Sequence, residues 1–168
     1  MIVNLIPHPT TPDGPITSLA VHLDRKGGRL CVRFVAEGAV NDVQWPGPTE
    51  GGRTDELWRH TCFEVFFMAG KGYREFNLSP SGQWASYRFD GYREGMAEAV
   101  EVADVAPLDL AEDMLALEAD LDLPSPIGRF ALSAVIEAND GAKTYWALAH
   151  PSDKPDFHHP DSFVLDLP

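Results

Sequence analysis

The chain has 168 residues, 44% of them hydrophobic, and it carries 13 Lys and Arg against 26 Asp and Glu, for a formal net charge of -13. This length can bury one sizeable core, which predicts a single domain over residues 1–168. A surface this acidic repels phosphate groups, so nucleic acid and anionic membrane surfaces are disfavoured as partners.

Residues 1–15 are predicted to be an extended lead-in, because four prolines between positions 7 and 15 remove backbone hydrogen-bond donors. The start of the chain does not resemble a secretion signal, and no later segment is apolar enough to span a bilayer. We therefore expect a cytoplasmic location. In a reducing compartment Cys31 and Cys62 are expected to be free thiols rather than a disulfide.

Short alternating segments separated by turn residues run through the rest of the chain and predict strands. Lys26-Gly27-Gly28 and Asn139-Asp140-Gly141 are hairpin turns, whereas residues 94–100 allow a turn or two of helix. This pattern favours an all-β fold, specifically an antiparallel β-sandwich of jelly-roll or immunoglobulin-like type with little helix. The expected strands are 16–24, 29–37, 42–45, 61–68, 73–79, 84–89, 100–106, 114–123, 130–137, 143–150 and 162–167.

The three predicted strands within residues 57–92 carry a mixed polar and aromatic face. Side chains alternate along a strand, so the apolar set of each strand is assigned to the core and the other set to the opposite face. In the third strand this assignment places Ala85, Tyr87 and Phe89 in the core. The predicted polar face carries His60, Cys62, Glu64, Glu75, Asn77, Trp84, Ser86 and Arg88.

A face of this composition suits a sugar, because a pyranose ring stacks on an aromatic side chain while its hydroxyls pair with carboxylates, amides and guanidinium. The alternative is a solvated sheet face on which Glu64, Glu75 and Arg88 form cross-strand charge pairs. Glu64 and Glu75 are also the pair of carboxylates that a glycosidase would use. Alternation alone leaves these interpretations open.

Metal ligands are weakly indicated. His60, Cys62 and Glu64 do not form a closed zinc pattern. The acidic run 109–122 offers oxygen ligands for calcium, but its spacing is not that of an EF-hand, and a solvated strand face explains it as well. No cofactor is therefore predicted.

Residues 151–160 place Phe157 beside two adjacent imidazoles, His158 and His159. One interpretation is a rigid loop that packs over the sheet edge. The other is a lid from which His158 or His159 reaches a ligand.

Four short motifs occur in order along the chain: E-x-F at 64–66, E-F-N at 75–77, S-P-S-G-x-W at 79–84 and KPDFHHPDSF at 154–163. With these motifs the chain resembles DOMON-like proteins related to carbohydrate-binding module family 9. The resemblance implies a jelly-roll-like β-sandwich that binds a sugar, or haem in other branches, usually without catalysis. Haem is disfavoured because His60 is the only obvious axial ligand on the proposed face.

The leading hypothesis is a non-catalytic module that binds a small sugar or sugar-like ligand through Glu64, Glu75, Asn77, Trp84 and Arg88, with His60, His158 and His159 at the rim. A second hypothesis is an enzyme acting on a small sugar or nucleotide-sugar, with Glu64 or Glu75 as base and a histidine partner. A third is a structural or protein-interaction domain. The sequence leaves the oligomeric state open.

Overall fold

A computed structural model describes residues 1–11 and 13–167, and it confirms an all-β fold. The described residues contain no α-helix, only three short 3₁₀ helices. The strands are β1 (Ile2–Pro7), β2 (Ile16–Lys26), β3 (Arg29–Gly38), β4 (Gly52–Arg53), β5 (Cys62–Ala69), β6 (Gly72–Leu78), β7 (Gln83–Phe89), β8 (Ala97–Glu98), β9 (Ala103–Val105), β10 (Asp109–Leu110), β11 (Met114–Asp122), β12 (Phe130–Glu137) and β13 (Lys143–Ala147); the 3₁₀ helices are η1 (Val40–Asp42), η2 (Leu57–Arg59) and η3 (Pro160–Ser162).

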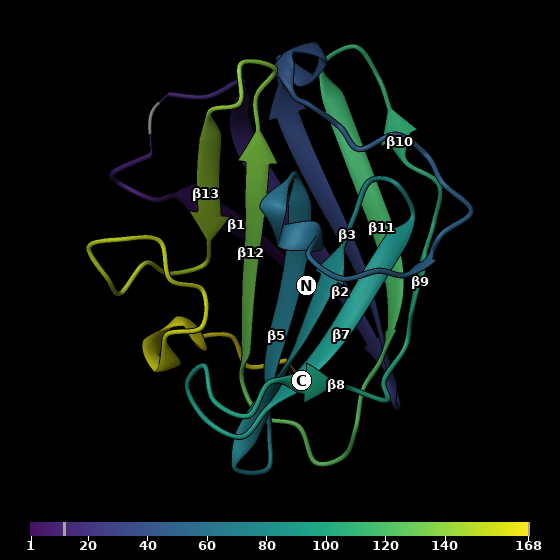
Figure 1. The fold of residues 1–168 in the computed structure, drawn as a ribbon, viewed down its shortest axis with the longest axis vertical. Coiled ribbons are helices and arrows are strands. Elements are labelled where there is room, and N and C mark those ends of the chain that lie inside the picture. Colours follow the sequence, from purple (N-terminus) through teal and green to yellow (C-terminus); the bar gives the residue numbers. More distant parts are fainter. Residues whose placement is uncertain (12, 168) are drawn as a thin grey trace.

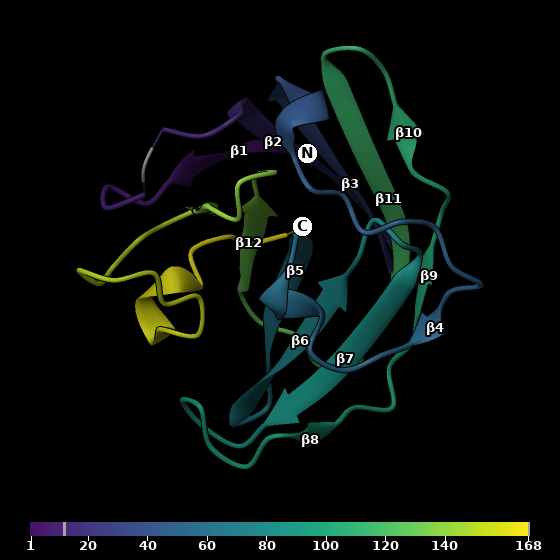
Figure 2. The same ribbon diagram turned by 45° about the horizontal axis from the view of Figure 1, so that its top comes forward.

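The strands form one curled sheet in the order β10-β11-β3-β2-β1-β13-β12-β5-β6-β7-β4. β1 pairs with β2 through its first residues and with β13 through its last, so it joins two halves of the sheet. Figures 1 and 2 show these halves facing one another, with β2, β3 and β11 opposite β5, β7 and β12. The main hydrophobic cluster lies between them and includes Phe34, Phe63, Phe76 and Phe130.

A second hydrophobic cluster covers the outer face of the half that contains β5, β6, β7 and β12. It consists of Phe66, Tyr73, Tyr87, Phe89 and Phe163 with smaller neighbours. The C-terminal segment, residues 148–167, supplies Phe163 and lies along this face, where it is drawn in yellow in Figures 1 and 2. These four strands are therefore buried on both faces.

Several sequence predictions need correction. The sheet is not purely antiparallel, because β4 pairs with β7 in parallel. The lead-in contains strand β1, residues 94–100 form no helix, and residues 162–167 make a single bridge at Leu165 instead of a strand. Both cysteines are free thiols, as predicted. The described residues include no helix with the length and apolarity needed to cross a membrane.

Candidate functional site

A cavity of about 430 Å³ lies on the outer face of the β5–β6–β7 half, within the range of about 300–1,000 Å³ that is usual for small-molecule sites. The C-terminal segment and the loop that follows β7 lie on this side of the sheet (Figure 2). Side chains from both, together with η2, complete the walls. The lining residues are Trp58, Glu64, Glu75, Phe89, Arg93, Met96, Val135, Tyr145, Pro155, Phe157 and His158.

The floor of the cavity is set by the register of five neighbouring strands. One row across the sheet runs Ala147, Ser133, Glu64, Asn77, Ala85, and the next runs Ala131, Phe66, Glu75, Tyr87. Glu64 and Glu75 therefore occupy adjacent rows on adjacent strands, as diagonal neighbours of one face. The small side chains in these rows leave space above the sheet.

The two carboxyl groups are buried, with 3% of Glu64 and 4% of Glu75 exposed. Burial raises the pKa of Glu64 to about 7, although the hydroxyl of Ser133, which donates to Glu64 Oε2 at 2.7 Å, opposes this shift. The pKa of Glu75 rises to about 8, because of burial first and of repulsion by Glu64 second. Near neutral pH the pair therefore retains protons that exposed carboxyls would have lost.

His158 is held against this pair by a chain of hydrogen bonds. The backbone N–H of Arg93 donates to the hydroxyl of Tyr73 at 3.3 Å, and that hydroxyl lies 2.8 Å from Nδ1 of His158. When the Tyr73 hydroxyl donates to Nδ1, the imidazole proton lies on Nε2. Nε2 lies 3.8 Å from Oε2 of Glu75. Burial, followed by the charge of Arg93, lowers the pKa of His158 to about 4, so the ring is neutral at physiological pH.

Arg93 fixes the loop after β7 to the C-terminal segment. Its guanidinium donates to Oδ1 of Asp156 at 2.8 Å, and Tyr92 also donates to that carboxylate. Arg93 has a φ of 54°, a left-handed conformation that costs a non-glycine residue free energy. Such strain concentrates at functional sites, and the Arg93 side chain lies at the cavity wall.

Three of the residues predicted from sequence line the cavity: Glu64, Glu75 and His158. Asn77 is fully buried beside them on β6. Among the described residues, no hydrogen-bond partner lies within 3.5 Å of the amide oxygen or nitrogen of Asn77 or of Oε2 of Glu75, although the Asn77 amide is near enough to lower the pKa of Glu75. Buried polar atoms without partners are uncommon in proteins, and apart from Oε2 of Glu101 those of the described residues belong to these two neighbouring side chains.

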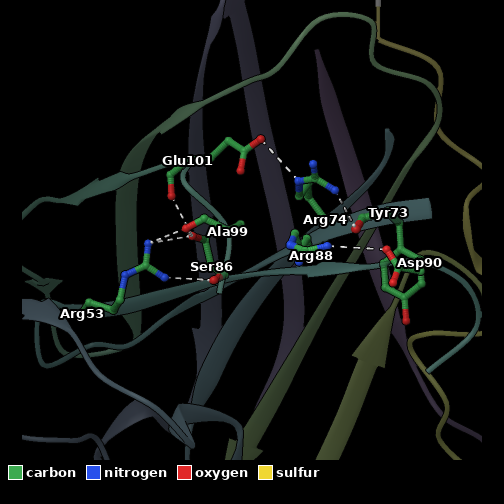
Figure 3. Close-up of polar contacts among 8 residues, drawn as sticks. All are labelled: Arg53, Tyr73, Arg74, Ser86, Arg88, Asp90, Ala99 and Glu101. Carbon is green, nitrogen blue, oxygen red and sulfur yellow. Dashed lines mark hydrogen bonds and ion pairs between the residues drawn. The ribbon is translucent and has the colours of Figure 1, made fainter. Parts of the chain in front are cut away.

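Trp84, Ser86 and Arg88 lie on the opposite face of β7, so their predicted place beside Glu64 and Glu75 is wrong. The register pairs Trp84 with Leu78 and Ser86 with Phe76, both of which point into the main core. Figure 3 shows the polar contacts on this face of β7. Arg53 donates to Ser86, Arg74 donates to Glu101, and the Arg88 guanidinium lies 3.5 Å from the Asp90 carboxylate. The polar groups of this face are thus largely engaged with one another.

Two predicted histidines lie outside the cavity lining. Nδ1 of His60 is 2.7 Å from Oε2 of Glu137, and the His60 side chain is 63% exposed. His159 is the N-cap of η3, and its Nδ1 accepts the backbone N–H of Asp161. Adjacent positions in a loop point in different directions, so only one of the two imidazoles of residues 158 and 159 faces the cavity.

The cavity walls contain residues that the sequence-based assignment placed elsewhere. Phe89 was assigned to the core, and Trp58, Tyr145, Phe157 and Arg93 were not included in the site. Two sequence features mark the segments that supply these residues: the turn-like GYREG after β7 and the aromatic residue in KPDFHHP. Neither feature shows that its segment folds back over the sheet to form a cavity wall.

No group of three or more His, Cys, Asp or Glu side chains within the described ranges is placed to hold a metal ion. The acidic run 109–122 is divided between β10 and β11. There Asp109 and Glu118 pair with Arg33, and Asp122 pairs with Arg29. Of the two interpretations predicted for this run, calcium ligands or a solvated strand face, the solvated face agrees with these exposed charge pairs.

Ser133→Ala is expected to lower the free energy of unfolding at pH 8.5 by about 1–2 kcal/mol, because a buried carboxylate loses its hydrogen-bond donor. The pKa of Glu64 should rise further, measurable by ¹³C NMR titration of the side-chain carboxyl. Ser18→Ala is the matched control: Ser18 donates to Glu37 at 2.8 Å, but on the exposed surface. An equal loss of stability in both variants would contradict a buried charge at Glu64.

Comparison with known proteins gives the fold some context. No protein-family model and no curated protein matches the sequence. The structure resembles that of a putative carbohydrate-binding protein from Bacteroides uniformis, with a TM-score of 0.65 and 14% sequence identity over 97% of this chain and 84% of that chain. At this identity the likeness shows a shared fold.

Proposed function

We propose that this protein binds a small sugar or sugar-like ligand, without catalysis, in the cavity between the β5–β6–β7 face and the C-terminal segment. The observation that carries the proposal is the pairing of aromatic walls with buried polar groups that lack partners. Trp58, Tyr145 and Phe157 provide aromatic side chains, and Glu75 and Asn77 provide buried polar atoms without a hydrogen-bond partner. A pyranose presents C–H surfaces to the first set and hydroxyls to the second.

Two further findings support the proposal. The first is the structural neighbour from Bacteroides uniformis, a putative carbohydrate-binding protein. The second is the resemblance of the sequence to DOMON-like proteins related to carbohydrate-binding module family 9, which implies a jelly-roll-like sandwich that binds a sugar. In this assignment the aromatic contacts come from Trp58 and Phe157, and Trp84 makes none.

An enzyme of small sugars is the second candidate, because a carboxyl with a pKa raised to about 8 is protonated at neutral pH and resembles a general acid. His158 beside Glu75 would be its partner. Incubation with nitrophenyl glycosides and nucleotide-sugars tests this candidate, since turnover that is lost in Glu75→Gln would favour the enzyme over the binding module.

Phe157→Ala is expected to weaken sugar binding about tenfold or more, because it removes a ring that lines the cavity. The measurement is isothermal titration calorimetry against a panel of monosaccharides and disaccharides. Arg88→Gln is the control, since Arg88 lies on the opposite face of β7. No binding to any sugar, or equal losses in the two variants, would refute the proposed function.

A further inference from the structure

We infer that the cavity selects a sugar that carries a protonated amine, with the ammonium group seated at Oε2 of Glu75. This inference rests on the proposed function and specifies its ligand class. The buried end of the cavity contains two carboxyl groups on diagonal positions of adjacent strands, and Oε2 of Glu75 has no hydrogen-bond partner among the described residues. A hydroxyl could satisfy one such atom, whereas an ammonium group could also replace the protons that the two neighbouring carboxyls retain and stabilise both in the ionised form.

The cavity does not supply that cation itself. Arg93 carries the only positive charge among the described lining residues, and its guanidinium is already bound to Asp156 at 2.8 Å. His158 lies 3.8 Å from Glu75 but is neutral at physiological pH, because burial lowers its pKa to about 4. Glu64 and Glu75 therefore have no cationic side chain among the described lining residues that is free to pair with them.

The surroundings favour a cation as well. Trp58, Phe89 and Tyr145 line the cavity, and the faces of aromatic rings attract ammonium groups. A neighbouring hollow shares Trp58 and Met96 with the cavity, and its described lining includes Asp55, Glu56 and Glu98 but no Lys or Arg. The approach to the cavity is therefore acidic, as is the protein as a whole, with a net charge of -13.

The charged and titratable groups around Glu75 come from every element packed against it. They are Cys62 and Glu64 on β5, Tyr73 on β6, Tyr87 on β7, Arg93 in the loop after β7, and Asp156 and His158 in the C-terminal segment. Burial raises the pKa of Tyr73 and of Tyr87, so both hydroxyls stay protonated. Between pH 6 and 8, Glu64 and Glu75 are the members of this group that change charge.

A bound ammonium would stabilise the ionised form of both carboxyls, so binding must release protons from the protein. A neutral sugar has no such effect. This linkage distinguishes the two ligand classes even where their affinities are similar.

The test is calorimetric titration at pH 7 with D-glucosamine and 6-amino-6-deoxy-D-glucose, against D-glucose and N-acetyl-D-glucosamine as uncharged matches. Each titration is repeated in phosphate and in MOPS, neither of which is a primary amine and whose different ionisation enthalpies report proton release. The expected result is binding of at least one amino sugar about tenfold or more tighter than glucose, since a hydrogen bond to a charged partner contributes more than one between neutral groups. Proton release should accompany that binding, and the affinity should fall as the pH is lowered from 7.5 to 5.5.

Glu75→Gln keeps the shape of the side chain and should abolish both the preference and the proton release. Glu112→Gln removes an exposed carboxylate in the turn before β11 and should change neither. Equal or tighter binding of the neutral sugars would overturn the ammonium inference and leave the proposed function intact. Equal binding of choline would overturn the sugar part of the inference, and binding of none of these compounds would reject both proposals.

Discussion

Raising the pH from 6.5 to 8.0 is expected to lower the free energy of unfolding by about 2 kcal/mol. Glu64 and Glu75 have pKa values of about 7 and about 8 in the folded protein, against about 4.3 for an unfolded chain. Between these limits the folded state holds more protons than the unfolded state, so its stability falls as the pH rises. The loss begins above the unfolded pKa and is complete only above the folded pKa of Glu75.

The pH window matters because His158 acts in the opposite direction. Its pKa is lowered to about 4 in the folded protein from about 6.5 in the unfolded chain, so it contributes a rise in stability between these two values. Below pH 6.5 this rise offsets part of the loss from the carboxyl pair. Above pH 6.5 His158 is neutral in both states, and the slope comes from Glu64 and Glu75.

Urea denaturation followed by tryptophan fluorescence at pH 6.5, 7.0, 7.5 and 8.0 measures this slope. Glu75→Gln should remove most of it and make the protein more stable than the wild type at pH 8.0, because a buried carboxylate without a hydrogen-bond partner on Oε2 is replaced by a neutral amide. Glu112→Gln is the control and should keep the wild-type slope. A pH-independent wild type would show that both carboxyls ionise normally and are not buried together.

A protein that retains a destabilising pair of carboxyls at a cavity wall is consistent with selection for binding at the expense of stability. Glu75→Gln tests this trade-off directly, since the same substitution is expected to stabilise the fold and to remove the preference for amino sugars.

The sequence predicted the strands of the β5–β6–β7 meander within a few residues, because each combines regular alternation with strong turn residues at 69–72 and 80–82. It also placed Glu64, Glu75 and Asn77 on one face, since Phe63 and Phe76 mark the core side of their strands clearly. Those assignments needed only local information. The all-β class followed from the same local patterns.

The third strand shows where local information is insufficient. In β7 both sets of alternating residues contain aromatics, and Ala85, Tyr87 and Phe89 face the core only if Trp84, Ser86 and Arg88 share the polar face. The outer face is itself covered by the C-terminal segment, so Ala85, Tyr87 and Phe89 belong to a second hydrophobic cluster. Alternation predicts one buried face, and it cannot decide the orientation of a strand that is buried on both.

The C-terminal segment also explains why His158 lines the cavity. The segment that carries Phe157 and His158 is attached to the sheet by contacts with residues more than 60 positions away in sequence, among them Asp156 with Arg93 and Phe163 with Phe66. No local pattern predicts those contacts.

Trp84 provides a decisive test of the corrected register. Trp84→Ala is expected to lower the free energy of unfolding by about 3 kcal/mol, because the indole packs against the main core and beneath the guanidinium of Arg53, which lies 4.6 Å from the ring centre. Urea denaturation at pH 7 measures the loss. Trp84→Phe, which keeps a ring in the core, should lose less.

Ligand binding in the cavity should not change with this loss of stability. In Trp84→Ala the NMR-detected pKa values of Glu64 and Glu75 and the affinity for the best sugar of the panel should stay as in the wild type, because Trp84 points away from both carboxyls. Phe89→Ala is the matched variant on the other face. Phe89 stacks on Tyr73 with ring centres 4.6 Å apart and lines the cavity, so its removal admits water, lowers the raised pKa of Glu75 and weakens binding. If Trp84→Ala abolished binding and Phe89→Ala left it unchanged, the polar face inferred from sequence would be right and the cavity would not be the binding site.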